Sequence, residues 1–165
     1  MSTTSGITAL IFTTFALASC VSVSIGPSKP TAAKNVKFKA PPEPFVAFSS
    51  DEIDAGWKNS SKGSSISYKS TCGDALDLPL EGVQQSMLYG IDNIKVIKSI
   101  RMTYNEREAL NSVVDGKVDG VDTKMEIMIL KKNRCTYMIS YVAIRKSYES
   151  DQPAFQNFLK SFEAP

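Results

Sequence analysis

The sequence contains no histidine among its 165 residues. The Ser-His-Asp and Cys-His catalytic arrangements and all imidazole metal sites require histidine, so these are excluded. A formal net charge of +2, from 19 basic and 17 acidic residues, gives no basis for sequence-wide nucleic-acid binding. The chain also lacks a glycine-rich phosphate loop and a zinc signature. We therefore expect no metal, no cofactor and no nucleic-acid partner.

The first twenty residues carry no charge at all. Within them, residues 7–17 form an apolar run interrupted only by threonine. This run is too short for a membrane-spanning helix, which needs about 20 apolar residues. Its length is typical of the apolar region of a secretory signal, about 7–15 residues. The sequence therefore predicts that residues 1–19 are a signal peptide.

The apolar run ends in Leu17-Ala18-Ser19-Cys20. This segment resembles the lipobox of bacterial lipoproteins, in which an aliphatic residue and two small residues precede a cysteine. The resemblance implies cleavage before Cys20 and acylation of its thiol, and two or more acyl chains would anchor the protein to a membrane. Because Ala16-Leu17-Ala18 also fits an ordinary cleavage site, plain secretion remains the alternative. Val21, in place of an aspartate retention signal, favours the outer membrane, facing the periplasm.

Residues 20–44 are rich in proline and lysine. Five of the eight prolines fall here, and four lysines face a single glutamate, Glu43. Such a composition is typical of an extended spacer, which would reach about 75 Å. We therefore expect a lipidated Cys20 and a tether over 20–44, followed by one globular domain over 45–165.

The globular part has the pattern of an α+β domain with an antiparallel sheet flanked by helices. Two short segments, 55–59 and 65–70, read as a hairpin. A helix capped by Asp77 is expected to begin near Pro79, because apolar residues then recur at helical spacing. Four further strands are expected at 94–104, 107–114 with an extension to 118, 125–130 and 135–144, and a helix is expected from about Ser150. The predicted order is β-β-α-β-β-β-β-α, with Ile94, Val96, Ile100, Met102 and Tyr104 on one face of their strand.

Cys72 and Cys135 remain once Cys20 is assigned to lipid. In an exported protein two such cysteines most often form a disulfide, which by chain entropy would contribute about 4 kcal/mol. Catalytic thiol chemistry is the alternative, but the chain has no histidine to generate the thiolate and no C-x-x-C motif. A metal site at these two cysteines lacks histidine ligands as well.

Other conspicuous motifs have ordinary structural explanations. The run Asp115–Asp122 could hold calcium, but its spacing differs from an EF-hand and each Asp-Gly pair favours a hairpin turn. The cluster Glu106–Glu108 is expected to be a solvated turn, because adjacent strand residues point to opposite faces. Trp57 is expected in the core. The segment Ser60–Gly63 lacks the S-x-x-K spacing of a catalytic serine.

The second half of the chain resembles the PsbP-like and DcrB-like α/β/α sandwich families. The resemblance rests on an Arg-Glu-Ala-Leu segment, a Val-Asp-Gly turn, the strand with Cys135-Thr136-Tyr137, and the ending Phe155-x-x-Phe158-Leu159-x-x-Phe162. It implies a central antiparallel sheet between helices and a non-enzymatic accessory or binding role, with no ligand residues carried over. It covers about residues 57–162.

We therefore expect a lipid-anchored, non-catalytic envelope module that binds a protein partner. A hydrolase that uses carboxylates, or Ser and Lys, without histidine is the first alternative; it would need two converging carboxylates in a pocket. A purely structural envelope lipoprotein is the second.

Overall fold

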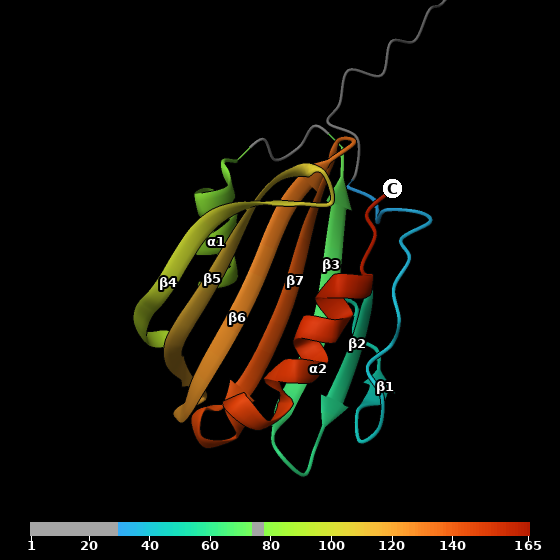
Figure 1. The fold of residues 1–165 in the computed structure, drawn as a ribbon. Coiled ribbons are helices and arrows are strands. Elements are labelled where there is room, and N and C mark those ends of the chain that lie inside the picture. Colours follow the sequence, from blue (N-terminus) through green and yellow to red (C-terminus); the bar gives the residue numbers. More distant parts are fainter. Residues whose placement is uncertain (1–29, 74–77) are drawn as a thin grey trace, which may run out of the picture.

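The computed structural model describes residues 30–73 and 78–165, which form a single curved antiparallel sheet with one helix on each face (Figure 1). The seven strands lie in the order β1-β2-β3-β7-β6-β5-β4. Their bounds are β1 (Val46–Phe48), β2 (Ala55–Asn59), β3 (Ser64–Cys72), β4 (Asp92–Tyr104), β5 (Arg107–Val118), β6 (Val121–Lys132) and β7 (Cys135–Ile144). The helices are α1 (Leu80–Met87), α2 (Tyr148–Ser161) and a short 3-10 helix at Arg145–Ser147. The predicted α+β class is confirmed, and the short strand β1, paired with β2, is an addition.

Three tight turns connect the four long strands. The central residues of each turn, Asn105-Glu106, Asp119-Gly120 and Asn133-Arg134, all have positive φ. Turns with two such residues match the twist of antiparallel strands, and Asn, Asp and Gly adopt this conformation most readily. The turns predicted at Glu106, at 119–120 and near 131–134 are therefore confirmed.

The turn expected at Asp115-Gly116 is wrong. Both residues lie inside β5 and pair with Lys124 and Thr123 of β6. The glycine serves close packing instead, because a Cβ on Gly116 would lie 2.6 Å from Cγ2 of Ile91. An Asp-Gly pair in a long strand thus marks a close approach rather than a chain reversal.

One face of the sheet, the α2 face, is covered by α2. The buried side chains Phe155, Phe158 and Leu159 of α2 pack on aromatic and aliphatic residues of β2, β3 and β7, among them Trp57. The prediction that Trp57 belongs to the core is confirmed, since it is buried and its ring lies 5.4 Å from that of Phe158. The helix begins at Tyr148, earlier than expected, so Pro153 lies in its second turn.

The opposite face, the α1 face, carries the shorter helix. Leu80, Val83 and the adjoining Leu88 pack on β5 and β6 residues such as Leu110 and Ile129. The apolar spacing read from the sequence is confirmed by these contacts. Asp77, the expected cap, lies outside the described residues. No helix within 30–73 and 78–165 has the length and apolarity to cross a membrane.

Residues 30–44 differ from the predicted spacer. Thr31 pairs with Cys72 and Lys37 pairs with Glu163 by backbone hydrogen bonds. The ring of Phe38 lies 5.4 Å from both Trp57 and Tyr68. The prolines keep this stretch extended, but it lies along the domain because its one aromatic ring completes the aromatic core. The folded unit therefore begins by residue 31 rather than at 45.

The structure contains the disulfide expected between Cys72 and Cys135. The two cysteines are directly opposite each other at the ends of β3 and β7, with Cα atoms 4.0 Å apart. The same end of the sheet holds the C-terminus, because Asn133 donates to the carbonyl of Pro165. Cys20 and the signal peptide of residues 1–19 lie outside the described residues.

Candidate interaction face

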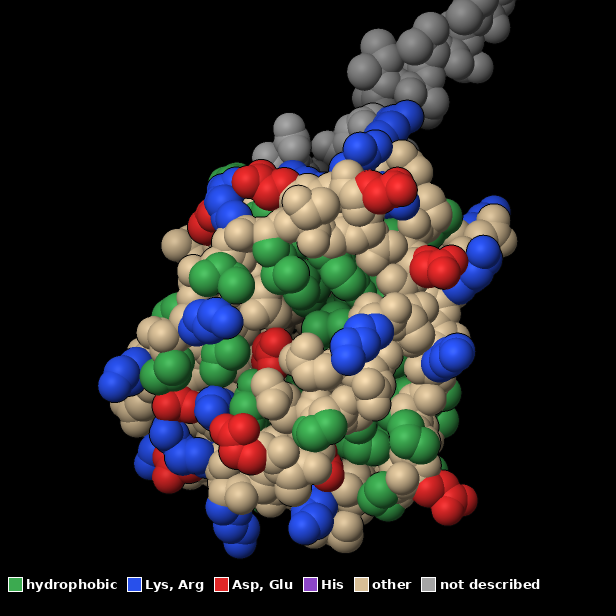
Figure 2. Space-filling view, in the orientation of Figure 1, with side chains coloured by type: hydrophobic (Ala, Val, Ile, Leu, Met, Phe, Trp, Pro, Cys, Tyr) green, Lys and Arg blue, Asp and Glu red, His purple; other side chains and the backbone are tan. Residues whose placement is uncertain are grey.

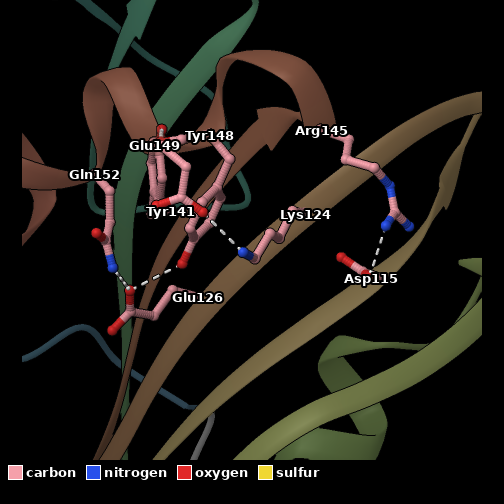
Figure 3. Close-up of polar contacts among 8 residues, drawn as sticks. All are labelled: Asp115, Lys124, Glu126, Tyr141, Arg145, Tyr148, Glu149 and Gln152. Carbon is pink, nitrogen blue, oxygen red and sulfur yellow. Dashed lines mark hydrogen bonds and ion pairs between the residues drawn. The ribbon is translucent and has the colours of Figure 1, made fainter.

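A buried carboxylate, Glu126 of β6, lies where α2 meets the sheet (Figure 3). Its side chain is 5% exposed and accepts four hydrogen bonds from neutral donors. Oε1 accepts from Asn111 and Gln156 at 3.1 and 3.0 Å, and Oε2 accepts from Tyr148 and Gln152, both at 3.1 Å. A carboxylate has about four acceptor positions, so these donors satisfy it completely. Three of the donors belong to α2, and Glu126 therefore fastens that helix to the sheet.

Two buried tyrosines support the same contact. The Tyr141 hydroxyl donates to the backbone carbonyl of Tyr148 at 2.7 Å, and the Lys124 ammonium lies 4.3 Å from the centre of the Tyr148 ring. Burial, with a smaller contribution from the nearby Glu126 carboxylate, raises the pKa of Tyr148 well above its usual value. Burial likewise raises the pKa of Tyr141. Both phenols therefore stay protonated and act as hydrogen-bond donors.

A second carboxylate, Asp115 of β5, lies on the same face of the sheet as Glu126. Asp115 is opposite Lys124, and the neighbouring pair on this face is Val113 with Glu126. Asp115 accepts a 2.8 Å hydrogen bond from Arg145, so its charge is compensated separately (Figure 3). Its other oxygen, Oδ1, is buried and has no hydrogen-bond partner among the described residues. Among the described residues, Asp115 and Glu126 accept hydrogen bonds from different donors and share none, which differs from the converging pair that the hydrolase alternative requires.

The edge strand β4 is the most exposed long element among the described residues. Asp92 through Thr103 are all exposed, and β4 pairs only with β5 because the sheet order ends there. Five of its large apolar side chains are 40–48% exposed: Ile94, Val96, Ile97, Ile100 and Met102. Exposed apolar residues in a contiguous row mark interaction surfaces more often than scattered ones do.

These apolar residues occupy both faces of β4, which differs from the single face predicted. Val96 pairs with Val114 on the α1 face, whereas Ile100 and Met102 pair with Asn111 and Ala109 on the α2 face. The pairing shifts between Asp92 and Lys95 and again between Val96 and Lys98. Each such bulge inserts an extra residue and reverses the alternation, which period-two reasoning does not foresee.

On the α1 face an open groove of about 630 Å³ separates the end of α1 from β4. Its lining includes Leu88, Ile91, Ile94 and Val96. Tyr89, at the rim, is 91% exposed. On the α2 face, Figure 2 shows hydrophobic side chains in a hollow beside α2, with basic and acidic side chains interspersed along the outer margin. The β4 side of the sheet is therefore apolar on both faces.

The charges on β4 are not equally compensated. Arg101 forms ion pairs of 2.7 Å with both Glu81 of α1 and Glu108 of β5. These carboxylates are the main cause of a raised pKa for Arg101. Lys95 and Lys98 are exposed and form no ion pair with any described residue. Lys98, opposite Val113, is the neighbour of Ile100 on the α2 face, whereas Lys95 lies opposite Asp115 of β5 without forming an ion pair with it.

The exposed edge strand β4 and the buried Glu126 were only partly visible in the sequence. The strand over 94–104 was predicted, but its position at the edge depends on the order in which distant strands pair. Glu126 could have been noticed as the one charged residue in the otherwise apolar segment 125–130, a pattern that indicates a buried and hydrogen-bonded carboxylate. Ser60–Gly63 forms the turn between β2 and β3 and has no role at β4 or Glu126.

No model of a known protein family matches the chain, and no curated protein matches it by sequence. Among solved structures, LpqN of Mycobacterium tuberculosis, described as involved in cell envelope biogenesis, is similar with a TM-score of 0.58 and 11% identity, covering 85% of this chain and 86% of LpqN. PsbP (CyanoP) of Synechocystis sp. PCC 6803 is similar with a TM-score of 0.57 and 10% identity, covering 90% of this chain and 99% of that one. The fold is PsbP-like. At these identities the likeness concerns the fold alone, in agreement with the resemblance read from the sequence.

Proposed function

We propose that this chain is a lipid-anchored, non-catalytic binding or assembly module of the bacterial envelope, and that it holds a protein partner through β4. The observation that carries the proposal is the thirteen-residue edge strand with apolar side chains exposed on both faces. An open strand edge provides backbone hydrogen bonds to a partner, and flanking apolar side chains provide contact area.

The placement in the envelope rests on the lipobox-like segment ending at Cys20. The PsbP-like fold shared with LpqN, a protein described as involved in cell envelope biogenesis, supports the same placement. The outer membrane facing the periplasm is the location that Val21 favours. The non-catalytic role is supported by the two buried carboxylates, which are bound to separate partners.

Site-specific photo-crosslinking in native cells tests the partner. A photoreactive residue at Met102 of β4 is expected to give a crosslink to one envelope protein. The same residue at the exposed Lys62, in the turn between β2 and β3, is the matched control and is expected to give none. Equal labelling from both positions, or no crosslink from any of several β4 positions, contradicts binding through β4.

Intact mass and fractionation test the anchor. We expect the native chain to begin at Cys20 and to carry the mass of its acyl chains. The Cys20→Ser variant is expected to leave the membrane fraction. A mature chain that begins at Ser19 without lipid would support plain secretion and contradict the anchor.

A further inference from the structure

The outer edge of β4 has a row of backbone N–H and C=O groups that no described strand pairs with. Natural proteins shield such edges with bulges and lysines, because an open edge otherwise pairs with any extended chain. In β4 both devices are present, but only in its first half. The bulges lie between Asp92 and Lys98, and the lysines of this half are Lys95 and Lys98, neither of which forms an ion pair with a described residue.

The second half of β4 is regular. Ser99 through Tyr104 pair residue by residue with Ser112 through Arg107. On the α2 face this half presents Ile100 and Met102, each 40% exposed. A strand added here would therefore find both a continuous row of backbone partners and apolar side chains to cover.

The charges restrict which strand can be added. The charge of Arg101 is already compensated by Glu81 and Glu108, so Arg101 attracts a carboxylate of an added strand only weakly. Lys95 and Lys98 remain available, and opposite charges on facing strands stabilise the pairing while like charges oppose it. A second copy of this chain that paired in parallel, or antiparallel about the first half of β4, would bring the same two lysines to this edge. An acidic strand would instead compensate them.

We propose that β4 accepts an extended, acidic segment of a partner protein by strand addition, with apolar residues over Ile100 and Met102 and carboxylates near Lys95 and Lys98. This inference rests on the proposed function and adds the chemistry of the partner. If the strand is antiparallel, the acidic residues lie toward its C-terminal end. The two lysines thereby favour an acidic strand over a basic one.

A peptide titration of the purified full chain tests this inference. The probe is a synthetic peptide of about ten residues, the length of a long strand, in which valine and threonine alternate and glutamates occupy the C-terminal half. The matched peptide has lysines in place of the glutamates. Backbone amide NMR shifts report where each peptide binds.

The acidic peptide is expected to shift the amides of residues 99–104 and to bind about tenfold tighter than the basic one. In K95E/K98E this preference should invert. In the control K62E/K69E, whose lysines lie on the far side of the sheet, the preference should persist. Two N-methylated versions of the acidic peptide, one methylated at the odd amides and one at the even amides, provide a further test. Only one of them should lose binding, because successive N–H groups of a strand point to opposite sides and only one set faces β4.

Equal affinity of the acidic and basic peptides overturns the inference, as does an absence of shifts in β4. A concentration-dependent dimer that uses β4, or binding of the chain to anionic vesicles in place of the peptide, also overturns it. If photo-crosslinks from Met102 to an envelope protein persist in these cases, the proposed function stands and only the acidic-strand inference fails.

Discussion

The hydrogen bonds of Glu126 allow a sharp prediction about the attachment of α2. Replacing Glu126 with glutamine keeps the size of the side chain but changes its hydrogen-bonding capacity. The carboxylate now accepts from four donors, of which Tyr148, Gln152 and Gln156 belong to α2. An amide oxygen accepts from two donors at most, and the new NH₂ group would face donors instead of acceptors.

Two of the four donors would therefore lose their acceptor. Each donor left without a partner costs about 1–2 kcal/mol at a site this buried. We expect E126Q to lower the free energy of unfolding by about 2–4 kcal/mol, a large part of the total stability of a domain, about 5–15 kcal/mol. With a urea m-value of about 2 kcal/mol/M, the unfolding midpoint should fall by about 1–2 M.

Equilibrium urea unfolding with the disulfide intact measures this change. The matched control is E149Q, the same substitution at an exposed position of α2, the helix that Glu126 of β6 holds to the sheet. Glu149 is bound to Lys124 at 3.0 Å but its side chain is 77% exposed, so its loss should cost at most about 0.5 kcal/mol. If the two variants unfold at the same urea concentration with unchanged m-values, Glu126 does not fasten α2 and the reasoning is refuted.

Three further predictions concern packing and ionisation. Phe38→Ala is expected to lower the free energy of unfolding by about 2–3 kcal/mol, since its ring packs in the aromatic core. An unchanged urea midpoint would show that residues 30–44 are a spacer, as their composition predicted. Gly116→Ala is expected to lower the free energy of unfolding by about 1–3 kcal/mol because its Cβ would overlap Ile91. In thermal unfolding, the double variant with Ile91→Ala should lose less stability than the sum of the two single variants; strictly additive losses would contradict the overlap. Burial raises the pKa of the Tyr148 phenol in the folded state, so its contribution to the free energy of unfolding is complete below about pH 10 and is lost as the pH rises further. In alkaline unfolding, the stability of Tyr148→Phe should therefore fall less steeply with pH than that of the parent, by up to about 1.4 kcal/mol per pH unit. If stability falls equally steeply in both proteins, Tyr148 makes no such contribution.

Periodicity and turn chemistry predicted the helices and long strands well because their signals are local. The helix from Leu80, the strands from Arg107 and Cys135, and the turn at Asn133 all follow from residues within a few positions of each other. The disulfide followed from cysteine count and the expected export. None of these predictions needed knowledge of which strand lies beside which.

The features that carry the proposed function are not local. Whether β4 lies at an edge depends on β7 inserting between β3 and β6, and composition does not reveal that order. The bulge at Ile97 reverses the faces of β4 without any distinctive residue. Phe38 looked like part of a polar tether, since its aromatic partners lie far along the chain at Trp57, Tyr68 and Phe158.

The attachment of Thr31 beside the disulfide limits how far the domain can stand from a bilayer. If Cys20 carries the acyl chains, eleven residues lead from it to Thr31, and even a fully stretched chain of that length spans only about 40 Å. The end of the sheet that holds Cys72, the turn at Asn133 and the C-terminus would then face the lipid. Tyr104 ends β4 at this end too, since its hydroxyl donates to Leu159 near the end of α2. A partner bound along the second half of β4 would then lie within a short distance of the membrane surface.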